Sequence, residues 1–375
     1  MLNQKFKAME AEMNQDFIER RDPIRGLFVG LVSGEHILFL GPPGTGKSAK
    51  GENLCSRIGG FYFRWLLSKT STPEELFGPI SLQALEQDSY RRVTTGKLPE
   101  SNIAFLDEIF KCNSAVLNSM LSILNERLFF NDGQPVQVPL EMVIGASNEL
   151  PEDKEELGAL WDRFMLRYQV DYIKDPRNFE RYLLGIGASA TTTMLSMAEL
   201  KQAQAEAAAV KVNKIIPVIS KIRQIMISKG ISVSDRRWKK CLAIIKANAW
   251  IEGRTEASEE DLEILAHALW QEPNQVAEIR KMIVGLVNPM DMIAQDLLDQ
   301  AVEIYQEAMA AAGTDKKTAA GMEANGKLTN ISQKLEKMKE EATAKGRSTS
   351  KVDEVMAQVL DYNKEVLAKC MGLRI

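Results

Sequence analysis

Residues 41–48 have the types and spacing of a phosphate-binding loop, because they match G-x-x-x-x-G-K-[ST] directly after the apolar residues 37–40. In such a loop the glycines let backbone N–H groups turn toward phosphates, the lysine supplies a positive charge, and the serine offers a hydroxyl to Mg²⁺. A strand before the loop and a helix after it distinguish this motif from a Gly-rich turn. The predicted nucleotide-binding residues are Gly41, Pro42, Pro43, Gly44, Thr45, Gly46, Lys47, Ser48 and Ala49.

Two carboxylates follow a second apolar run. Asp107 and Glu108 come directly after residues 103–106, and ligands of parallel sheets bind where the strands end. We expect Asp107 to hold Mg²⁺ together with Ser48, and Glu108 to polarise a water for in-line attack on the γ-phosphate. A strand that ends in a charged turn looks similar, so the interpretation depends on the position of Asp107, 60 residues after Lys47.

An amide and two sets of arginines complete the candidate chemistry. Asn148 ends the apolar residues 142–147, and its side chain can orient the attacking water beside Glu108. Arg163 has no evident task within its own chain, whereas a guanidinium against a neighbouring subunit's γ-phosphate raises the rate of hydrolysis by about 10³ to 10⁵. Arg236 or Arg237 begins a helix and can reach the phosphates from another side; a solvated helix start is the alternative.

Composition excludes several other classes of function. The 375 residues carry 47 basic and 51 acidic side chains, for a net charge of −4, which argues against a partner bound mainly through nucleic-acid phosphates. With two histidines in the chain, neither a histidine metal cluster nor a histidine-based triad can be assembled. The chain therefore offers phosphate chemistry rather than zinc or triad chemistry.

Cysteines and hydropathy indicate the compartment. The four cysteines, Cys55, Cys112, Cys241 and Cys370, are scattered singly, as expected of reduced thiols. No apolar run approaches the roughly 20 residues that cross a bilayer, and the first residues lack the apolar segment of a signal peptide. We expect a soluble, cytoplasmic protein without a transmembrane segment.

Apolar periodicity predicts an α/β domain followed by helices. Short apolar runs alternate with amphipathic stretches from about residue 24 to 170, which is typical of a parallel sheet covered on both faces. A helix is predicted over about 114–127, with Asn113 or Ser114 as its N-cap. The five predicted strands are residues 37–40, 61–65, 103–106, 142–147 and 165–170.

Strand signals stop near residue 176, and periodic helical segments continue to the C-terminus. We divide the chain into an α/β core at 1–174, a helical unit at 175–272 and a C-terminal helical unit at 273–375. In the last unit, two seams of apolar residues and a third helix near 293–309 favour an antiparallel hairpin or a three-helix bundle over an intermolecular coiled coil, because residues 346–348 interrupt the pattern. The two seams are Leu328, Ile331, Leu335 and Met338, and Val352, Val355, Val359, Tyr362 and Val366.

Six segments together resemble the AAA+ ATPases of the MoxR group, and most closely its RavA-like branch. The resemblance covers roughly residues 15–275, and the motifs occur in the order of that family. The segments are S-T-P-E-E-L-F-G-P at 71–79, L-P-E at 98–100, F-L-D-E-I at 105–109, L-N-E-R at 124–127, A-S-N-E-L-P at 146–151 and S-D-R-R-W-K-K at 234–240.

The resemblance implies a P-loop AAA+ core with a five-stranded parallel sheet, an all-helical lid, ATP and Mg²⁺ bound between core and lid, and subunits closed into a hexameric ring. Residues 41–48 correspond to Walker A, and Asp107 and Glu108 to Walker B. Asn148 corresponds to sensor 1, Arg163 to the arginine finger that acts on a neighbour, and Arg236 to sensor 2. Arg167 is a second candidate for the subunit interface.

Two protrusions are also implied by the resemblance. Residues 77–98, with 90–93 as a candidate strand, correspond to an insertion in the second helix, and 128–138, turning at 131–133, correspond to a hairpin. Both are expected at the pore or at a partner surface, or are ordinary exposed loops. Unlike better-known RavA-like chains, this chain has only a short connection at 311–326 in place of a small β-rich domain.

The leading hypothesis is a Mg²⁺-dependent ring ATPase that remodels or activates a client protein, as a chaperone does, with a von Willebrand factor A (VWA) domain protein as the partner that the family suggests. ATP would draw lid and core together through Arg236, and Arg163 would report the nucleotide state to the next subunit. The alternative is a nucleotide-gated scaffold whose helical tail binds partners while hydrolysis is incidental. A nucleic-acid motor is disfavoured by the acidic balance.

Overall fold

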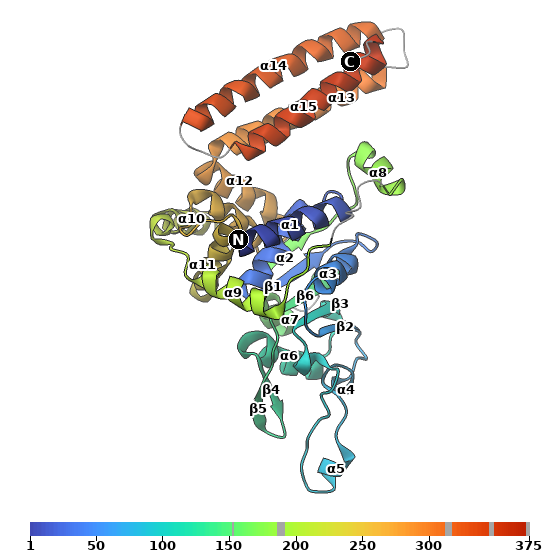
Figure 1. Cartoon of the computed structure of the whole chain (residues 1–375), viewed down its shortest axis with the longest axis vertical. Helices are drawn as coiled ribbons and strands as arrows, with labels where there is room; N and C mark the ends of the chain where they lie inside the picture. The colour runs from blue at the N-terminus through green and yellow to red at the C-terminus, as the bar shows by residue number, and fades with distance from the viewer. Residues whose placement is uncertain (152–153, 186–191, 312–316, 345–348, 373–375) are drawn as a thin grey trace. The chain divides into compact units, whose positions relative to one another are not determined.

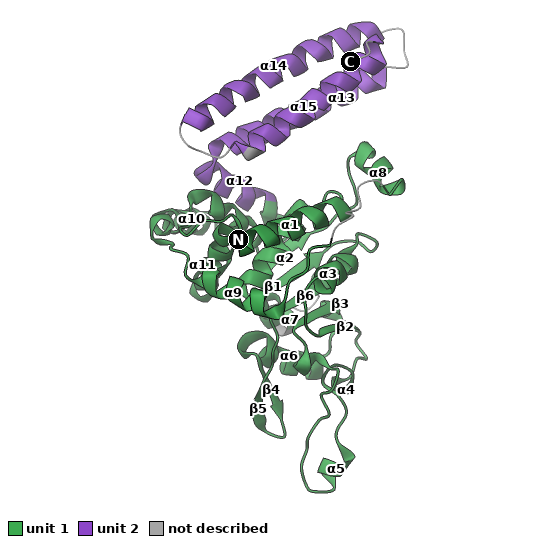
Figure 2. Ribbon diagram, viewed as in Figure 1, with its two compact units in different colours: residues 1–276 green, residues 277–375 purple. Residues whose placement is uncertain are grey.

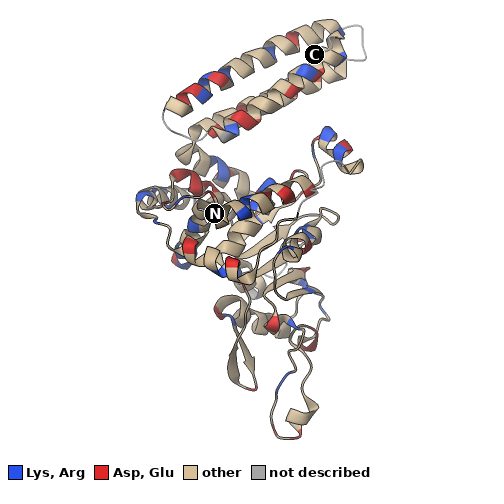
Figure 3. Ribbon diagram, viewed as in Figure 1, with Lys and Arg blue, Asp and Glu red and all other residues tan. Residues whose placement is uncertain are grey.

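The computed structural model describes residues 1–151, 154–185, 192–311, 317–344 and 349–372 (Figure 1). The chain forms two compact units, Met1–Val276 and Ala277–Ile375 (Figure 2). Acidic and basic side chains are interspersed along the helices of each unit (Figure 3). None of the described helices is long and apolar enough to cross a membrane.

A five-stranded parallel sheet forms the centre of the first unit, as predicted. Its strand order is β2-β3-β6-β1-β7. All five strands run in the same direction, so their carboxyl ends lie along one edge of the sheet. The strands are β1 (His36–Leu40), β2 (Tyr62–Leu66), β3 (Ile103–Asp107), β6 (Met142–Ser147) and β7 (Phe164–Gln169).

Burial on both faces explains why the central strands read as unbroken apolar runs. Every residue of β1 and β6 is buried, because helices pack on the sheet. Helix α2 (Arg21–Ser33) packs on β1 and β7, and α3 (Lys47–Ser56) packs on β3 and β6. The remaining helices of this core are α1 (Leu2–Asp16), α6 (Ser114–Glu126), which begins at an N-cap where the Asn113 side chain accepts from Val116 N–H, and α7 (Lys154–Arg163).

The predicted hairpin is present, as β4 (Leu128–Asn131) and β5 (Gln134–Gln137). Asp132 and Gly133 have positive φ angles of 54° and 72°, the conformation of a tight hairpin turn. The candidate strand at 90–93 was wrong: a single bridge joins Ile80 to Arg92. Side chains of the hairpin turn bind other N–H groups of this segment: Asp132 accepts from Tyr90 N–H, and Asn131 accepts from Arg92 N–H.

Short helices lie in and beside the inserted loop at 77–98, and longer ones follow the sheet (Figure 1). The insertion predicted at 77–98 contains α5 (Leu82–Leu85); α4 (Pro73–Phe77) precedes it, the 3₁₀ turn η1 (Leu98–Glu100) follows it, and η2 (Ile109–Lys111) follows β3. After β7 come α8 (Pro176–Leu183), α9 (Met197–Ala208), η3 (Asn213–Ile215), α10 (Ile216–Ser228), α11 (Asp235–Ile251) and η4 (Glu259–His267). Helix α11 packs against α2 and α9, so this helical region is joined to the sheet domain.

Three helices pack on one another in the second unit, which decides between the hairpin and the bundle. They are α13 (Pro289–Ala311), α14 (Lys317–Ala344) and α15 (Ser350–Met371), preceded by α12 (Gln275–Val287). Both predicted seams lie in their shared core, where Met338 is partly buried. The connection expected at 311–326 is helical from Lys317 onward, and the predicted break at 346–348 lies outside the described residues.

Candidate functional site

The candidate chemical groups gather at the carboxyl edge of the sheet. In the register of the sheet, Leu40 pairs with Ser147, and Leu66 pairs with Asp107. The phosphate-binding loop follows Leu40, Glu108 follows Asp107, and Asn148 follows Ser147, so each group begins where a parallel strand ends. This is the edge at which open α/β sheets bind ligands.

The loop has the backbone of a phosphate cradle. Gly44 and Gly46 have φ angles of 80° and 71°, a left-handed conformation that side chains with a Cβ disfavour. Gly46 is the N-cap residue of α3, whose first residue is Lys47. The order strand, glycine-rich loop and helix N-terminus is therefore the one that binds phosphate through backbone N–H groups.

The Lys47 ammonium lies across the mouth of this loop. It donates to the carbonyl oxygens of Gly41 at 2.6 Å and Pro42 at 2.9 Å, and to Asn148 Oδ1 at 2.8 Å. Burial lowers the pKa of Lys47, and the charges of Asp107 and Glu108 oppose that shift. The lysine is thus placed among acceptors at the point where the two strand ends meet.

One carboxylate oxygen of Glu108 accepts a hydrogen bond, and the other has no hydrogen-bond partner in the part of the chain that the structure describes. Asn148 Nδ2 donates to Glu108 Oε1 at 2.6 Å. Glu108 Oε2 is shielded from solvent and has no hydrogen-bond partner, although Lys111 Nζ forms an ion pair with it at 3.3 Å. A carboxylate oriented in this way can accept a proton from a water molecule placed beside Oε2.

Two side chains could supply oxygen ligands to a divalent cation. The Ser48 hydroxyl and the Asp107 carboxylate are hard donors of the kind that Mg²⁺ prefers, and Mg²⁺ usually adds waters and substrate phosphates to one or two carboxylates. Asp107 Oδ1 also accepts from Glu108 N–H at 3.1 Å. Within the described ranges, no group of three or more His, Cys, Asp or Glu side chains could hold a metal by itself. The donor set therefore fits an ion shared with a nucleotide.

Arg163 lies at the opposite, amino edge of the sheet. It is the last residue of α7 and precedes Phe164, which pairs with His36, the first residue of β1. Its Nε is buried without a hydrogen-bond partner, and its Nη1 lies 3.4 Å from Asp162 Oδ2. The Arg163 Nε–H is thus a donor that no group among the described residues satisfies.

Arg236 lies near Arg163 on this amino edge. Arg236 Nη2 donates to Asn125 Oδ1 at 3.1 Å, and the carbonyl oxygen of the preceding Leu124 lies 3.0 Å from His36 Nε2. Burial and then the charge of Arg236 lower the pKa of Arg163. The structure thus brings Lys47, Asn148 and Glu108 together, and separately Arg163 and Arg236, but it does not bring the two sets together.

Arg167 and Arg237 are structural. Arg167, the second candidate for a subunit interface, is fully buried: it donates to the Trp270 and Phe164 carbonyl oxygens, and its guanidinium stacks 4.3 Å from the Trp161 ring centre. The expectation of an interface role was wrong, because those contacts leave the guanidinium inside the core. Arg237 is 1% exposed and donates to the carbonyl oxygens of Ala268, Phe164 and Met165. Both arginines join η4 and its C-terminal end to β7.

Lys50, which the sequence interpretation passed over, is fully buried in α3. Its ammonium donates to the Thr45 carbonyl oxygen at 3.2 Å and to the Gly46 carbonyl oxygen at 2.8 Å. Burial, with smaller contributions from the charges of Arg20 and Lys47, lowers the pKa of Lys50 to about 7. A lysine three residues after Lys47, one helical turn along α3, was the signal that could have identified it.

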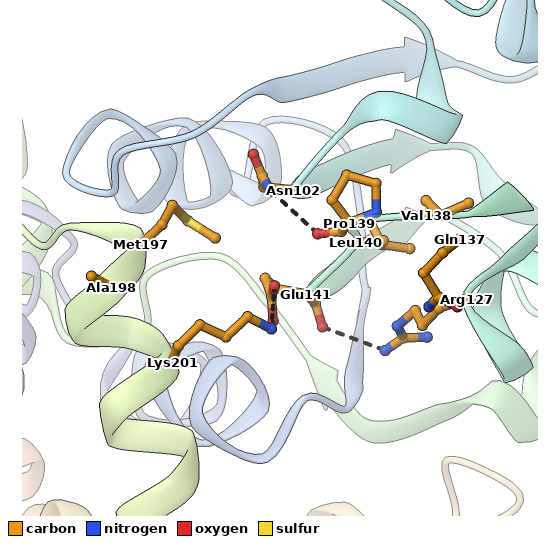
Figure 4. Close-up of a pocket in the computed structure, with 10 residues that line it drawn as sticks. All are labelled: Asn102, Arg127, Gln137, Val138, Pro139, Leu140, Glu141, Met197, Ala198 and Lys201. Carbon is orange, nitrogen blue, oxygen red and sulfur yellow. Dashed lines mark hydrogen bonds and ion pairs between the residues drawn. The ribbon is translucent and has the colours of Figure 1, made fainter.

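A cavity of about 510 Å³ lies on the amino side of the sheet, between the β5–β6 connection and α9 (Figure 4). Glu141 pairs with Lys201 at 2.6 Å, and Asn102 Nδ2 donates to the Pro139 carbonyl oxygen at 3.2 Å. Arg127 donates to the Leu124 and Gly34 carbonyl oxygens. The charged groups that line the cavity are therefore already paired, and no group of the predicted phosphate site reaches it.

Comparisons with known proteins identify the relatives of this chain. Residues 4–210 match the sequence model of the MoxR domain in the MoxR-vWA-beta-propeller ternary systems, and residues 214–283 match an AAA lid domain. The chain is 34% identical to the uncharacterized protein MJ0812 of Methanocaldococcus jannaschii, over 96% of this chain and 98% of that protein. It is 24% identical to the chaperone MoxR1 of Mycobacterium tuberculosis, over 52% of each chain.

A solved structure has the same fold. The crystal structure of a candidate ATPase from Cytophaga hutchinsonii superposes with a TM-score of 0.59 at 18% identity, covering 76% of this chain and 94% of that chain. At this identity the likeness extends to the arrangement of sheet and helices.

Proposed function

The chain belongs to the MoxR family of AAA+ ATPases, and from that premise we propose that it hydrolyses ATP with Mg²⁺ at a site completed by a second copy of itself. The observation that carries this proposal is the continuous contact from Lys47 through Asn148 to Glu108 at the mouth of the loop. These three residue types, in contact, are those that in-line hydrolysis of a γ-phosphate needs.

In this proposal each side chain has one task. The N–H groups of residues 41–49 bind the phosphates, and Lys47 exchanges its carbonyl acceptors for phosphate oxygens. Glu108 accepts a proton from the attacking water through Oε2, and Asn148 fixes the carboxylate and the water. Ser48 and Asp107 would hold Mg²⁺, which neutralises charge on the phosphates.

The proposed arginines come from the neighbouring copy. β1 has five residues and is therefore about 16 Å long. Arg163 and Arg236 lie at the amino edge of the sheet, and Lys47 lies at the carboxyl edge. The distance between the two edges supports a role for these arginines at the nucleotide of a second copy. We therefore propose that Arg236 acts with Arg163 across the interface, in place of the expectation that Arg236 draws its own lid and core together.

The wider assignment follows from the family and is part of the proposal. A head-to-tail interface generates a ring when the rotation between neighbours closes, and we propose a closed hexamer. The name of the matched family, which joins MoxR to vWA and beta-propeller proteins, supports a VWA-domain partner, and the relative named a chaperone supports remodelling of a client protein. The RavA-like branch, the cytoplasmic location and the division at residues 174 and 272 remain predictions from the sequence.

The test is the variant Glu108→Gln, measured beside Glu336→Gln, an exposed carboxylate of the second unit. Glu108→Gln should bind ATP and assemble like the wild type yet lose ATP turnover by at least about 10²-fold, because a neutral amide cannot accept the proton of the water. Glu336→Gln should keep full turnover. Rapid hydrolysis by Glu108→Gln would remove Glu108 from its role. A partner that binds both proteins equally whenever nucleotide is present would favour the scaffold alternative.

A further inference from the structure

Lys50 occupies an unusual place for a positive charge. It lies in the first turn of α3, behind the phosphate-binding loop, and its side chain is fully buried. Its ammonium lies 5.9 Å and 5.6 Å from the ring centres of Phe17 and Phe39. Neutral hydrogen-bonding or aliphatic side chains are the usual occupants of such a pocket, because an ammonium without a carboxylate partner is costly to bury.

The groups facing Lys50 do not compensate its charge. Two nearby ionisable groups lower the pKa of Lys50: Arg20, which precedes α2, and Lys47. Both are positive. Its described partners are two backbone carbonyl oxygens rather than a carboxylate. Burying an ammonium group beside two other positive groups is costly in the ligand-free protein, and an anion bound at the loop would offset that cost.

The two carbonyl groups determine the direction of two N–H groups. In a planar trans peptide unit the C=O and the N–H point in opposite directions. Lys50 Nζ donates to the Thr45 carbonyl at 3.2 Å and to the Gly46 carbonyl at 2.8 Å, and the Gly46 carbonyl also accepts from the backbone N–H of Lys50 at 3.2 Å. The N–H groups of the same peptide units belong to Gly46 and Lys47, and they consequently point away from Lys50, toward the side of the loop that faces the ligand.

We propose that Lys50 is a positioning residue for the triphosphate: it holds the Thr45 and Gly46 carbonyls from behind, so that the Gly46 and Lys47 N–H groups face the phosphates. This inference rests on the proposed nucleotide binding and adds a second lysine to the loop. Lys47 touches the phosphates directly, whereas Lys50 acts through the backbone. Glycine at 46 permits the loop backbone to take this left-handed conformation.

The variant Lys50→Met tests the proposal in the full chain, with Lys211→Met as the matched control on an exposed lysine. Loss of two hydrogen bonds from a charged donor should raise the Kd for ADP and the KM for ATP by about 10- to 100-fold. The kcat should stay within about twofold, because backbone N–H groups bind the ground state and the transition state alike. Lys211→Met should change neither constant.

Hydrogen exchange separates positioning from a general loss of stability. With nucleotide at saturation, the amides of residues 46 and 47 should exchange several-fold faster in Lys50→Met than in the wild type, while the strands β1 and β6 exchange at the same rate. Faster exchange throughout the first unit would mean that Lys50 only stabilises the fold, and the positioning role would be wrong.

A second variant guards against a protein that does not fold. Lys50→Arg keeps a charged donor, and its Kd for ADP should stay well below that of Lys50→Met; equal loss in both variants would overturn the proposal. If the wild type binds ADP and Lys50→Met binds it equally tightly, Lys50 has no positioning role and the nucleotide site stands. If the wild type binds no nucleotide, both the proposed function and this inference are wrong.

Discussion

Asn148 donates to Glu108 Oε1 at 2.6 Å, and the same amide accepts from Lys47 through Oδ1. One neutral side chain therefore holds the proposed base of the reaction and the proposed phosphate-binding lysine in a single arrangement. An aspartate here would add a second negative charge beside Glu108, and an alanine would remove the link between Glu108 and Lys47. The amide is suited to this position because it both donates and accepts without changing the charge of the site.

The first prediction concerns this amide. Asn148→Ala should lower kcat by about 10²-fold, because Glu108 loses the donor that orients it and a general base contributes about 10² to 10⁴. The Kd for ATP should change by less than about fivefold, since the backbone of the loop remains. Steady-state kinetics and nucleotide titration measure the two constants. A large loss of binding with unchanged kcat would mean that Asn148 serves the ligand rather than Glu108.

The fold was largely predictable because burial leaves a direct pattern in the sequence. The five strands lie within one residue or two of their predicted bounds, since fully buried strands are continuous apolar runs between polar segments. The prediction of a strand at 90–93 was wrong for a related reason. On one side this segment forms a single bridge with Ile80, and on the other its N–H groups bind the side chains of Asn131 and Asp132; a contact between side chains and backbone leaves no periodic signal.

The site was predictable where its residues follow strands, and less so elsewhere. Lys47, Glu108 and Asn148 meet because parallel strands end at one edge. The positions of the arginines depend on how α6, α7 and α11 pack, and residue spacing does not reveal that packing. The neighbouring Arg236 and Arg237 differ in burial: Arg236 is exposed, whereas Arg237 is 1% exposed. Only the tertiary fold decides which of the two faces solvent.

The second prediction uses this adjacent pair. Arg237→Met should lower the free energy of unfolding of the first unit by about 3 to 5 kcal/mol, because the carbonyl oxygens of Ala268, Phe164 and Met165 lose their charged donor. Arg236→Met should change it by less than about 0.5 kcal/mol. Denaturant unfolding of both variants provides the comparison. Equal stability of the two would show that the buried hydrogen bonds of Arg237 contribute little.

The third prediction is a pH dependence at the contact between α1 and α9. Lys5 binds Glu199 at 2.6 Å, and this bond, with the Ser196 N–H, lowers the pKa of Glu199 from 4.5 to about 2. The depressed pKa means that the contribution to stability is present above pH 4.5 and is lost as the pH falls toward 2. Because the pair is one third exposed, we expect about 0.5 to 1 kcal/mol.

The variant Glu199→Gln isolates that contribution. Its free energy of unfolding should be lower than that of the wild type at pH 7, and the difference should shrink between pH 4.5 and 2. Urea unfolding at several pH values measures the difference, with Glu336→Gln as the control. A difference that stays constant with pH would indicate a packing effect rather than the ion pair.

The fourth prediction tests whether two copies build one site. Arg163→Ala and Glu108→Gln should each lose about 10³-fold in turnover. In a mixture, an interface that takes Glu108 from the Arg163→Ala copy and Arg163 from the Glu108→Gln copy is complete. Random assembly makes about one quarter of head-to-tail interfaces complete, so an equimolar mixture should recover roughly that share of wild-type activity.

Subunit exchange must be verified before the mixture is read, for example by fluorescence transfer between labelled copies. The same recovery is expected when Arg236→Ala replaces Arg163→Ala, because Arg236 lies beside Arg163 at the amino edge of the sheet. Recovery with Arg163→Ala but not with Arg236→Ala would mean that Arg236 acts on the nucleotide bound by its own chain. If neither mixture gains activity although the copies exchange, Glu108 and Arg163 do not act together across an interface, and the proposal of a site shared by two copies is wrong.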